Sequence, residues 1–180
     1  MLGLGGGLTY GGSMHDTLVS SYTSDFTSDS DGWIAYSVQG NLTIEANQTI
    51  GGSDGWLKMT YDTNQTSSSG IRAASGFFGT NRAVGDYVVL SYKIYYVDDS
   101  GKWTGSDSEV STVWTVFAKN DTITVSMDEV ASITRHKTTP STSAGSSTSP
   151  ILGVNLAEDR PLANAVFYVK DIRIDWYRPI

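Results

Sequence analysis

The chain has 180 residues, which suits one domain with a sizeable core, and its formal net charge is −7. The absence of cysteine excludes disulfide bonds, thiolate metal sites and a cysteine nucleophile. The acidic balance argues against nucleic acid or an anionic bilayer as partner. The 19 glycines and the 11% aromatic content favour β-structure and loops.

The first segment of the chain is rich in glycine, with four apolar side chains between the glycines: Leu2, Leu4, Leu8 and Tyr10. Two interpretations stay open. Residues 1–20 are either a disordered start, or an assembly arm that orders when those side chains meet a partner subunit, as a strand added to a neighbour's sheet edge. The segment lacks the basic start and compact apolar run of a secretory signal, so it predicts no export.

Alternation of apolar and polar residues predicts strands through residues 21–180, which we take as one domain. The clearest runs cover residues 34–38, 42–44, 57–61, 88–96, 110–118, 122–128 and 166–176. Turn residues separate them, and no stretch has a helical period. We expect a polar loop at residues 62–70 and a low-complexity loop at residues 138–150. The pattern predicts an all-β chain folded as an antiparallel β-sandwich.

Five segments of the chain resemble, in order, the landmarks of jelly-roll carbohydrate-binding modules. They are SDFTSDSDGWIAYS, SDGWLKMTYD, VGDYVVLSYKIYYVDDSG, VWTVFAKNDTITVSM and NAVFYVKDIRIDWY, and they lie within residues 24–178. The resemblance implies a jelly-roll β-sandwich. It does not imply sugar binding to the same degree, because this sandwich is reused for other roles.

The resemblance also raises the question of calcium. In the resembling families, carboxylates near the first and closing strands often hold a structural calcium ion. Here Lys170 replaces the first acidic residue of the closing pair, and Thr27 replaces the acidic residue after the phenylalanine. Asp25 and Asp171 remain and could share a calcium ion with backbone carbonyls, or both could be solvated carboxylates. We predict no other cofactor.

Sugar recognition would use exposed aromatic rings, because sugars present apolar C–H faces. Trp56 and Tyr95 alternate away from the apolar residues of their strands, and Trp103 lies in a stretch of Ser, Gly and Asp. These three residues are the candidate carbohydrate platform. The alternative is that Trp56 and Tyr95 face the second sheet, or that all three seal subunit contacts.

The sequence contains no recognisable catalytic set. Its two histidines, His15 and His136, are far apart, and neither a nucleophile elbow nor a phosphate-binding loop is present. Most carboxylates fall in Ser/Gly-rich stretches, where solvated charges are expected. We therefore predict a protein that is not an enzyme.

Two hypotheses of function remain. The main one is a non-catalytic structural subunit of a bacteriophage virion, such as a capsid decoration or a tail or fibre protein. It would form homo-oligomers, contact other virion subunits and display a sandwich able to hold a host-surface glycan. The alternative is an extracellular carbohydrate-binding module of a secreted polysaccharide-acting system. The glycine-rich arm favours the first, and the family resemblance with the aromatic platform favours the second.

Overall fold

The computed structural model describes residues 16–37, 42–63, 69–73, 83, 85–97, 112–113, 121–122, 128–138, 151–154 and 163–180. These residues form strands, turns and bends. None of the residues in these ranges forms a helix long and apolar enough to cross a membrane. The strands are β1 (Thr17–Ser24), β2 (Trp33–Ser37), β3 (Leu42–Ile50), β4 (Ser53–Tyr61), β5 (Ser69–Ala73), β6 (Tyr87–Tyr96), β7 (Thr112–Val113), β8 (Asp121–Thr122), β9 (Ala131–Thr138), β10 (Ile151–Val154) and β11 (Val166–Arg178).

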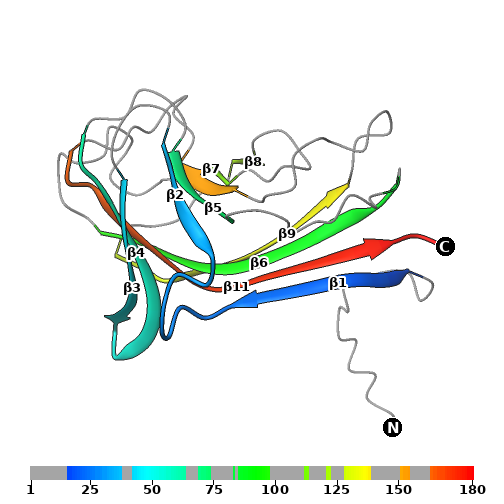
Figure 1. Cartoon of the computed structure of the whole chain (residues 1–180), viewed down its shortest axis with the longest axis horizontal. Helices are drawn as coiled ribbons and strands as arrows, with labels where there is room; N and C mark the ends of the chain where they lie inside the picture. Colours follow the sequence, from blue (N-terminus) through cyan, green and yellow to red (C-terminus); the bar gives the residue numbers. More distant parts are fainter. Residues whose placement is uncertain are drawn as a thin grey trace, which may run out of the picture.

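Strand β11 is the centre of the larger sheet, which has the order β3-β4-β11-β6-β9 (Figure 1). Strand β6 pairs with β11 along one edge, from Phe167 to Tyr177. On the other edge, β4 pairs with Val166–Val169 and β1 pairs with Ile172–Arg178. Strands β4 and β1 therefore follow one another along the same edge of β11, and all these pairings are antiparallel.

A β-bulge in β11 marks the point where its neighbour changes. Lys170 pairs with Lys93 and Arg173 pairs with Ser91, so β11 has one more residue than β6 between these two positions. Asp171 has a left-handed φ of 52°, a conformation that aspartate tolerates better than most residues. The extra residue changes the phase of the alternation, and Val169 and Ile172 both face the core.

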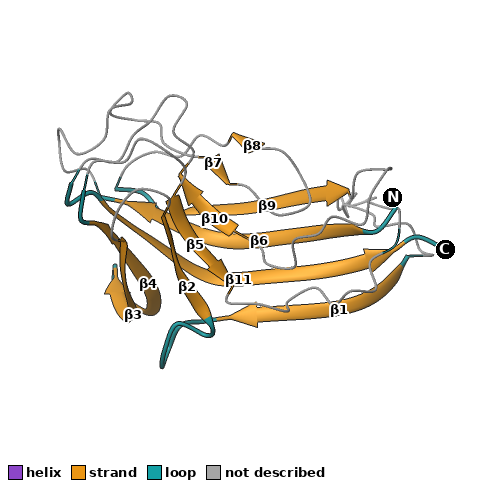
Figure 2. Cartoon of the chain, turned by 45° about the horizontal axis from the view of Figure 1, so that its top comes forward, coloured by secondary structure: helices purple, strands orange, loops and turns teal. Residues whose placement is uncertain are grey.

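A smaller sheet of order β10-β5-β2 lies across the larger one (Figures 1 and 2), and β7 pairs with β8. Trp33 of β2 and Ile71 of β5 are fully buried and contribute to the same core as the larger sheet. The predicted antiparallel β-sandwich is therefore confirmed.

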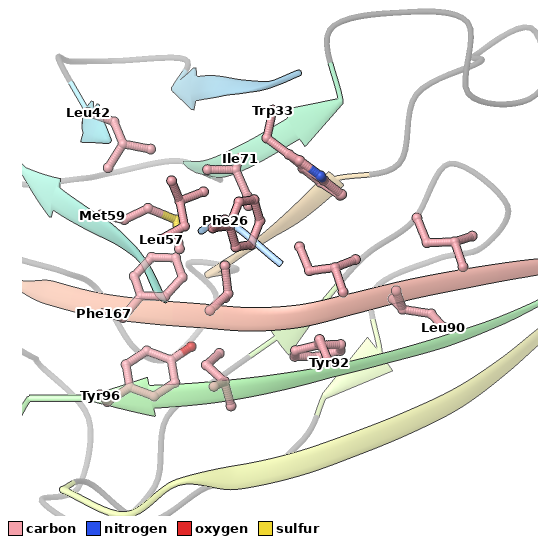
Figure 3. Packing of buried hydrophobic residues seen from close by; sticks show 14 of the residues in the cluster. Phe26, Trp33, Leu42, Leu57, Met59, Ile71, Leu90, Tyr92, Tyr96 and Phe167 are labelled. Atoms are coloured by element: carbon pink, nitrogen blue, oxygen red, sulfur yellow. The ribbon is translucent and has the colours of Figure 1, made fainter. Parts of the chain in front are cut away.

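The core is aromatic and aliphatic, and it fills the space between the two sheets (Figure 3). The ring of Phe167 stacks between Tyr61 and Tyr96, with ring centroids 5.9 and 5.4 Å apart. Phe26, from the turn between β1 and β2, is fully buried among them. Each side chain of this size contributes about 1.5–3 kcal/mol by leaving water.

Several strands were not predicted from the sequence. Strand β1 begins at Thr17, inside the segment assigned to the arm, and β5 begins at Ser69, inside the expected loop at residues 62–70. Strands β9 and β10 were also missed. Most side chains of β1 are exposed on both faces, so the strand shows no apolar alternation. Residues 1–15 and 139–150, and most of the predicted strands at 110–118 and 122–128, lie outside the described residues.

A buried carboxylate joins the end of β11 to the start of β6. Asp86 is fully buried and accepts hydrogen bonds from the Ala83 N–H (2.8 Å), Trp176 Nε1 (3.0 Å), and Arg178 Nε (2.9 Å) and Nη2 (2.8 Å). Burial on its own raises the pKa of Asp86, but the hydrogen bonds from Arg178, Ala83 and Trp176 outweigh it and the pKa is lowered. The ionised form therefore stabilises this end of the sandwich.

Replacing Asp86 by alanine is expected to reduce the free energy of unfolding by about 3–5 kcal/mol, because Arg178 and the indole N–H lose their common acceptor. Since the folded-state pKa is lowered, the stabilisation is complete above the unfolded-state pKa of about 3.9 and is lost as the pH falls below it. Urea unfolding from neutral to acidic pH measures both effects. An Asp86→Asn variant with the stability and acid profile of the wild type would contradict the assignment.

Candidate functional site

The outer face of the larger sheet, which points away from the core, carries a pair of tyrosines. Tyr95 of β6 and Tyr168 of β11 pair directly across the sheet. Their ring centroids are 6.0 Å apart and the rings are inclined at 57°. The Tyr95 hydroxyl donates to Asp128 Oδ1 at 3.1 Å. Burial, then the hydrogen bond to Asp128, raises the pKa of Tyr95, so its hydroxyl stays neutral. Sequence alternation placed Tyr95 on this face correctly.

A second tyrosine pair lies at the other end of the same two strands. Tyr87 and Tyr177 stack with ring centroids 5.2 Å apart and an angle of 15° between the rings. The Tyr87 hydroxyl donates to Asp16 Oδ2 at 2.7 Å. Burial, followed by this hydrogen bond, raises the pKa of Tyr87 to about 12. The outer face of β6 and β11 thus has aromatic rings at both ends.

Between the two tyrosine pairs, at the bulge of β11, lies an open cavity of about 300 Å³. The cavity is lined by Thr23, Ser24, Asp25, Ser91, Asp171, Ile172 and Arg173. It brings together Asp25 and Asp171, the two carboxylates that the sequence singled out as possible calcium ligands. The lining residues include hydroxyl-bearing and charged side chains together with Ile172, and most of the surface they expose to the cavity is apolar.

Several charges on the outer face form opposite pairs. Lys93 Nζ is 2.7 Å from Asp171 Oδ2, and Arg173 Nε is 2.8 Å from Asp175 Oδ2. A third pair joins Lys58 Nζ to Glu45 Oε2 at 3.6 Å. A charged ligand that bound to these groups would compete with such pairs, whereas a neutral ligand with hydroxyl groups could hydrogen-bond to both members of a pair without separating them.

The carboxylates of the cavity are already engaged with protein groups. Asp25 Oδ1 accepts from the Thr27 N–H at 3.0 Å and from the Thr27 hydroxyl at 2.8 Å, and these bonds lower the pKa of Asp25. Asp171 is bound to Lys93. In the described part of the chain, no three or more histidine, aspartate or glutamate side chains gather in a way that could hold a metal ion.

Of the three candidate platform residues, the structure places two. Tyr95 lies on the outer face, as described above. Trp56 also alternates away from the core cluster, but its side chain is only 2% exposed, so it offers no open ring face. Trp103 lies outside the described residues, and so do the arm residues Leu2, Leu4, Leu8 and Tyr10.

The outer face of the smaller sheet carries a large apolar side chain, Ile34, that is left partly exposed. Trp33 and Ile71 face the core, so the register places the alternate residue Ile34 on the other face, where it is 37% exposed. The sequence predicted alternation in residues 34–38, but the pattern alone does not say which of the alternating residues face the core.

Asp31, which was not predicted to have a specific role, organises the turn between β1 and β2. One of its carboxylate oxygens, Oδ2, accepts the Ser24 hydroxyl (2.6 Å) and the backbone N–H groups of Asp25 and Phe26 (both 3.0 Å). The carbonyl of Asp31 accepts the Tyr22 hydroxyl at 2.8 Å. The aspartate before the Gly-Trp pair is therefore structural, since it fixes the turn that brings Phe26 into the core.

No protein-family model matches the chain, and no curated protein matches it in sequence. Solved structures do match its fold. The xylan-binding domain CBM22-1 of Paenibacillus barcinonensis Xyn10C matches with a TM-score of 0.56 and 16% identity, covering 88% of this chain and 95% of that domain. The chain has the fold of a carbohydrate-binding module.

A second match agrees with this. The C-terminal family 22 carbohydrate-binding module of Clostridium thermocellum Xyn10B matches with a TM-score of 0.56 and 13% identity. The match covers 86% of this chain and 91% of that module. The resemblance to jelly-roll carbohydrate-binding modules is thus confirmed for the fold. Both neighbours are binding modules, and likeness at this level of identity concerns the fold alone.

Replacing Asp31 by alanine is expected to lower the free energy of unfolding by about 2–3 kcal/mol, because three donors at the turn lose a charged acceptor. Asp25→Ala is the matched control, because the exposed Asp25 carboxylate accepts only from Thr27 within the described residues. Chemical unfolding of both variants measures the difference. Equal stabilities of the two variants would show that Asp31 does not organise the turn.

Proposed function

We propose that this chain is a carbohydrate-binding module that holds a neutral polysaccharide on the outer face of its larger sheet. The carbohydrate-binding-module fold supports the class of function. The Tyr95–Tyr168 pair indicates which face binds, because it combines two half-buried rings with the neutral hydroxyl group of Tyr95. Aromatic rings of this kind bind the C–H faces of sugars at little entropic cost.

The paired charges of the outer face indicate a neutral ligand that carries hydroxyl groups. Lys93 with Asp171 and Arg173 with Asp175 offer donors and acceptors beside the cavity, and each pair carries no net charge. Hydroxyl groups of a neutral sugar can bond to both members of a pair without separating them. The ligand is bound and released unchanged, so the proposal needs no catalytic group.

The experiment is a binding assay with soluble neutral polysaccharides, such as xylan and mixed-linkage glucan, by affinity electrophoresis and calorimetry. An acidic polysaccharide is the ligand control. Tyr95→Ala is expected to weaken binding to the neutral polysaccharide by about tenfold, which corresponds to the loss of about 1.4 kcal/mol of ring contact. Circular dichroism and thermal unfolding check that the variant is folded.

Ile34→Ala, on the outer face of the smaller sheet, is the matched variant for the position of the site. If Ile34→Ala abolishes binding and Tyr95→Ala does not, the function stands and the face is wrong. If the wild type binds none of the polysaccharides, the proposed function is wrong.

The virion hypothesis stays a prediction. Its anchoring residues Leu2, Leu4, Leu8 and Tyr10 lie outside the described residues, and the matching structures are carbohydrate-binding modules. Three further points also stay predictions: contacts with other virion subunits, assembly into homo-oligomers, and location in a virion or outside the cell. The carbohydrate-binding alternative is the one that the fold favours.

A further inference from the structure

Three segments from distant parts of the sequence meet beside the bulge of β11. The carbonyl of Phe26, in the first turn, accepts the Asn47 N–H of β3 at 2.9 Å. The carbonyl oxygen of Asp25 lies so close to Gly55 of β4 that a Cβ there would be 2.5 Å from it. Gly55 also has a φ of +80°, so glycine is required at this contact. The contact of Asp25 with Gly55 thereby places the first turn beside the start of β4, where Ser53 and Asp54 lie.

Lys170, the first residue of the bulge, extends its ammonium group toward these oxygens. Lys170 Nζ donates to Ser53 Oγ at 2.8 Å and to the carbonyl oxygen of Asp54. Its charge also acts on Asp25: after the two Thr27 hydrogen bonds, the Coulombic effect of Lys170 contributes to the lowered pKa of Asp25. The ammonium thus bonds to the start of β4 and attracts the carboxylate of the first turn.

Calcium, which the family resemblance implies, does not fit this arrangement. The ion would need several free oxygen ligands, but a positive side chain already bonds to Ser53 Oγ and the Asp54 carbonyl. Asp25 is hydrogen-bonded to Thr27, and Asp171 is paired with Lys93 at 2.7 Å. A calcium ion at this place would also be repelled by the ammonium groups of Lys170 and Lys93.

We propose that the ammonium group of Lys170 replaces a bound metal ion in this sandwich. It joins the start of β4 to the closing strand β11 beside the contact of Gly55 with the first turn, and the stability of the domain is therefore independent of calcium. The inference does not depend on whether, or where, the chain binds a polysaccharide.

The first test is the thermal unfolding of the wild-type chain after treatment with a chelator, with and without millimolar calcium chloride. The proposal predicts the same Tm in both conditions. A chelator-treated protein whose Tm rises on addition of calcium, with no such rise for magnesium, would overturn it. This measurement needs no variant, so a folding defect cannot obscure the outcome.

The second test compares variants of the two lysines. Lys170→Met keeps most of the side-chain stem and removes the charge, and it is expected to lower Tm by about 2–6 °C through loss of two charge-assisted hydrogen bonds. Lys93→Met is the matched control: it removes an exposed ion pair and is expected to lower Tm by about 2 °C or less. A Lys170→Met protein as stable as the wild type would overturn the proposed role.

The third test places a carboxylate where the ammonium was. Lys170→Asp adds negative charge beside Asp25 and the Asp54 carbonyl, and so should lower Tm in the presence of chelator. Millimolar calcium should then raise the Tm of this variant while leaving the wild type unchanged. If calcium does not stabilise Lys170→Asp, the surrounding oxygens do not form a cation site, and the proposed replacement is wrong.

Discussion

Strand β11 pairs with two different strands on one edge, because β4 pairs with its first residues and β1 with its last. The bulge at Lys170–Arg173 lies where this change occurs within one strand of 13 residues. It also shifts the alternation, so that Val169 before it and Ile172 after it both point into the core. A regular strand would turn one of these side chains to solvent.

The features of functional interest depend on the same strand. Tyr168 and Tyr177, on either side of the bulge, pair with Tyr95 and Tyr87 of β6 and so place aromatic rings at both ends of the outer face. The cavity opens at the bulge itself, where Asp171 and Arg173 lie beside Ser91. Lys170 reaches the start of β4 from the same point. Core packing and the outer face are thus fixed by one local irregularity.

The sequence was sufficient to predict strands that bury one face, because burial of one face imposes a period of two on the apolar residues. This holds for the runs that became β4, β6 and β11. It fails for β1, whose side chains are mostly exposed, and for β5, which is too short for its pattern to stand out. The bulge was not predicted either. Its effect appears in the sequence only as a change of phase between Val169 and Ile172.

The candidate site shows the same limit. Alternation placed both Tyr95 and Trp56 away from the core, yet only Tyr95 remains partly exposed and Trp56 is buried. Whether another segment covers a residue depends on tertiary contacts that no local pattern contains. The sequence also drew attention to Asp25, whereas the carboxylate that organises the turn belongs to Asp31. Both residues lie in one polar stretch, and only the fold distinguishes them.

The most direct test of polysaccharide binding by the outer face is an NMR titration of the isotopically labelled protein with a short neutral oligosaccharide. The account predicts that amide shifts change for outer-face residues of β6 and β11, around Tyr95, Tyr168 and the bulge, while core residues such as Phe167 and Trp33 change little. Shifts confined to other surfaces, or no shift with any neutral oligosaccharide, would contradict it.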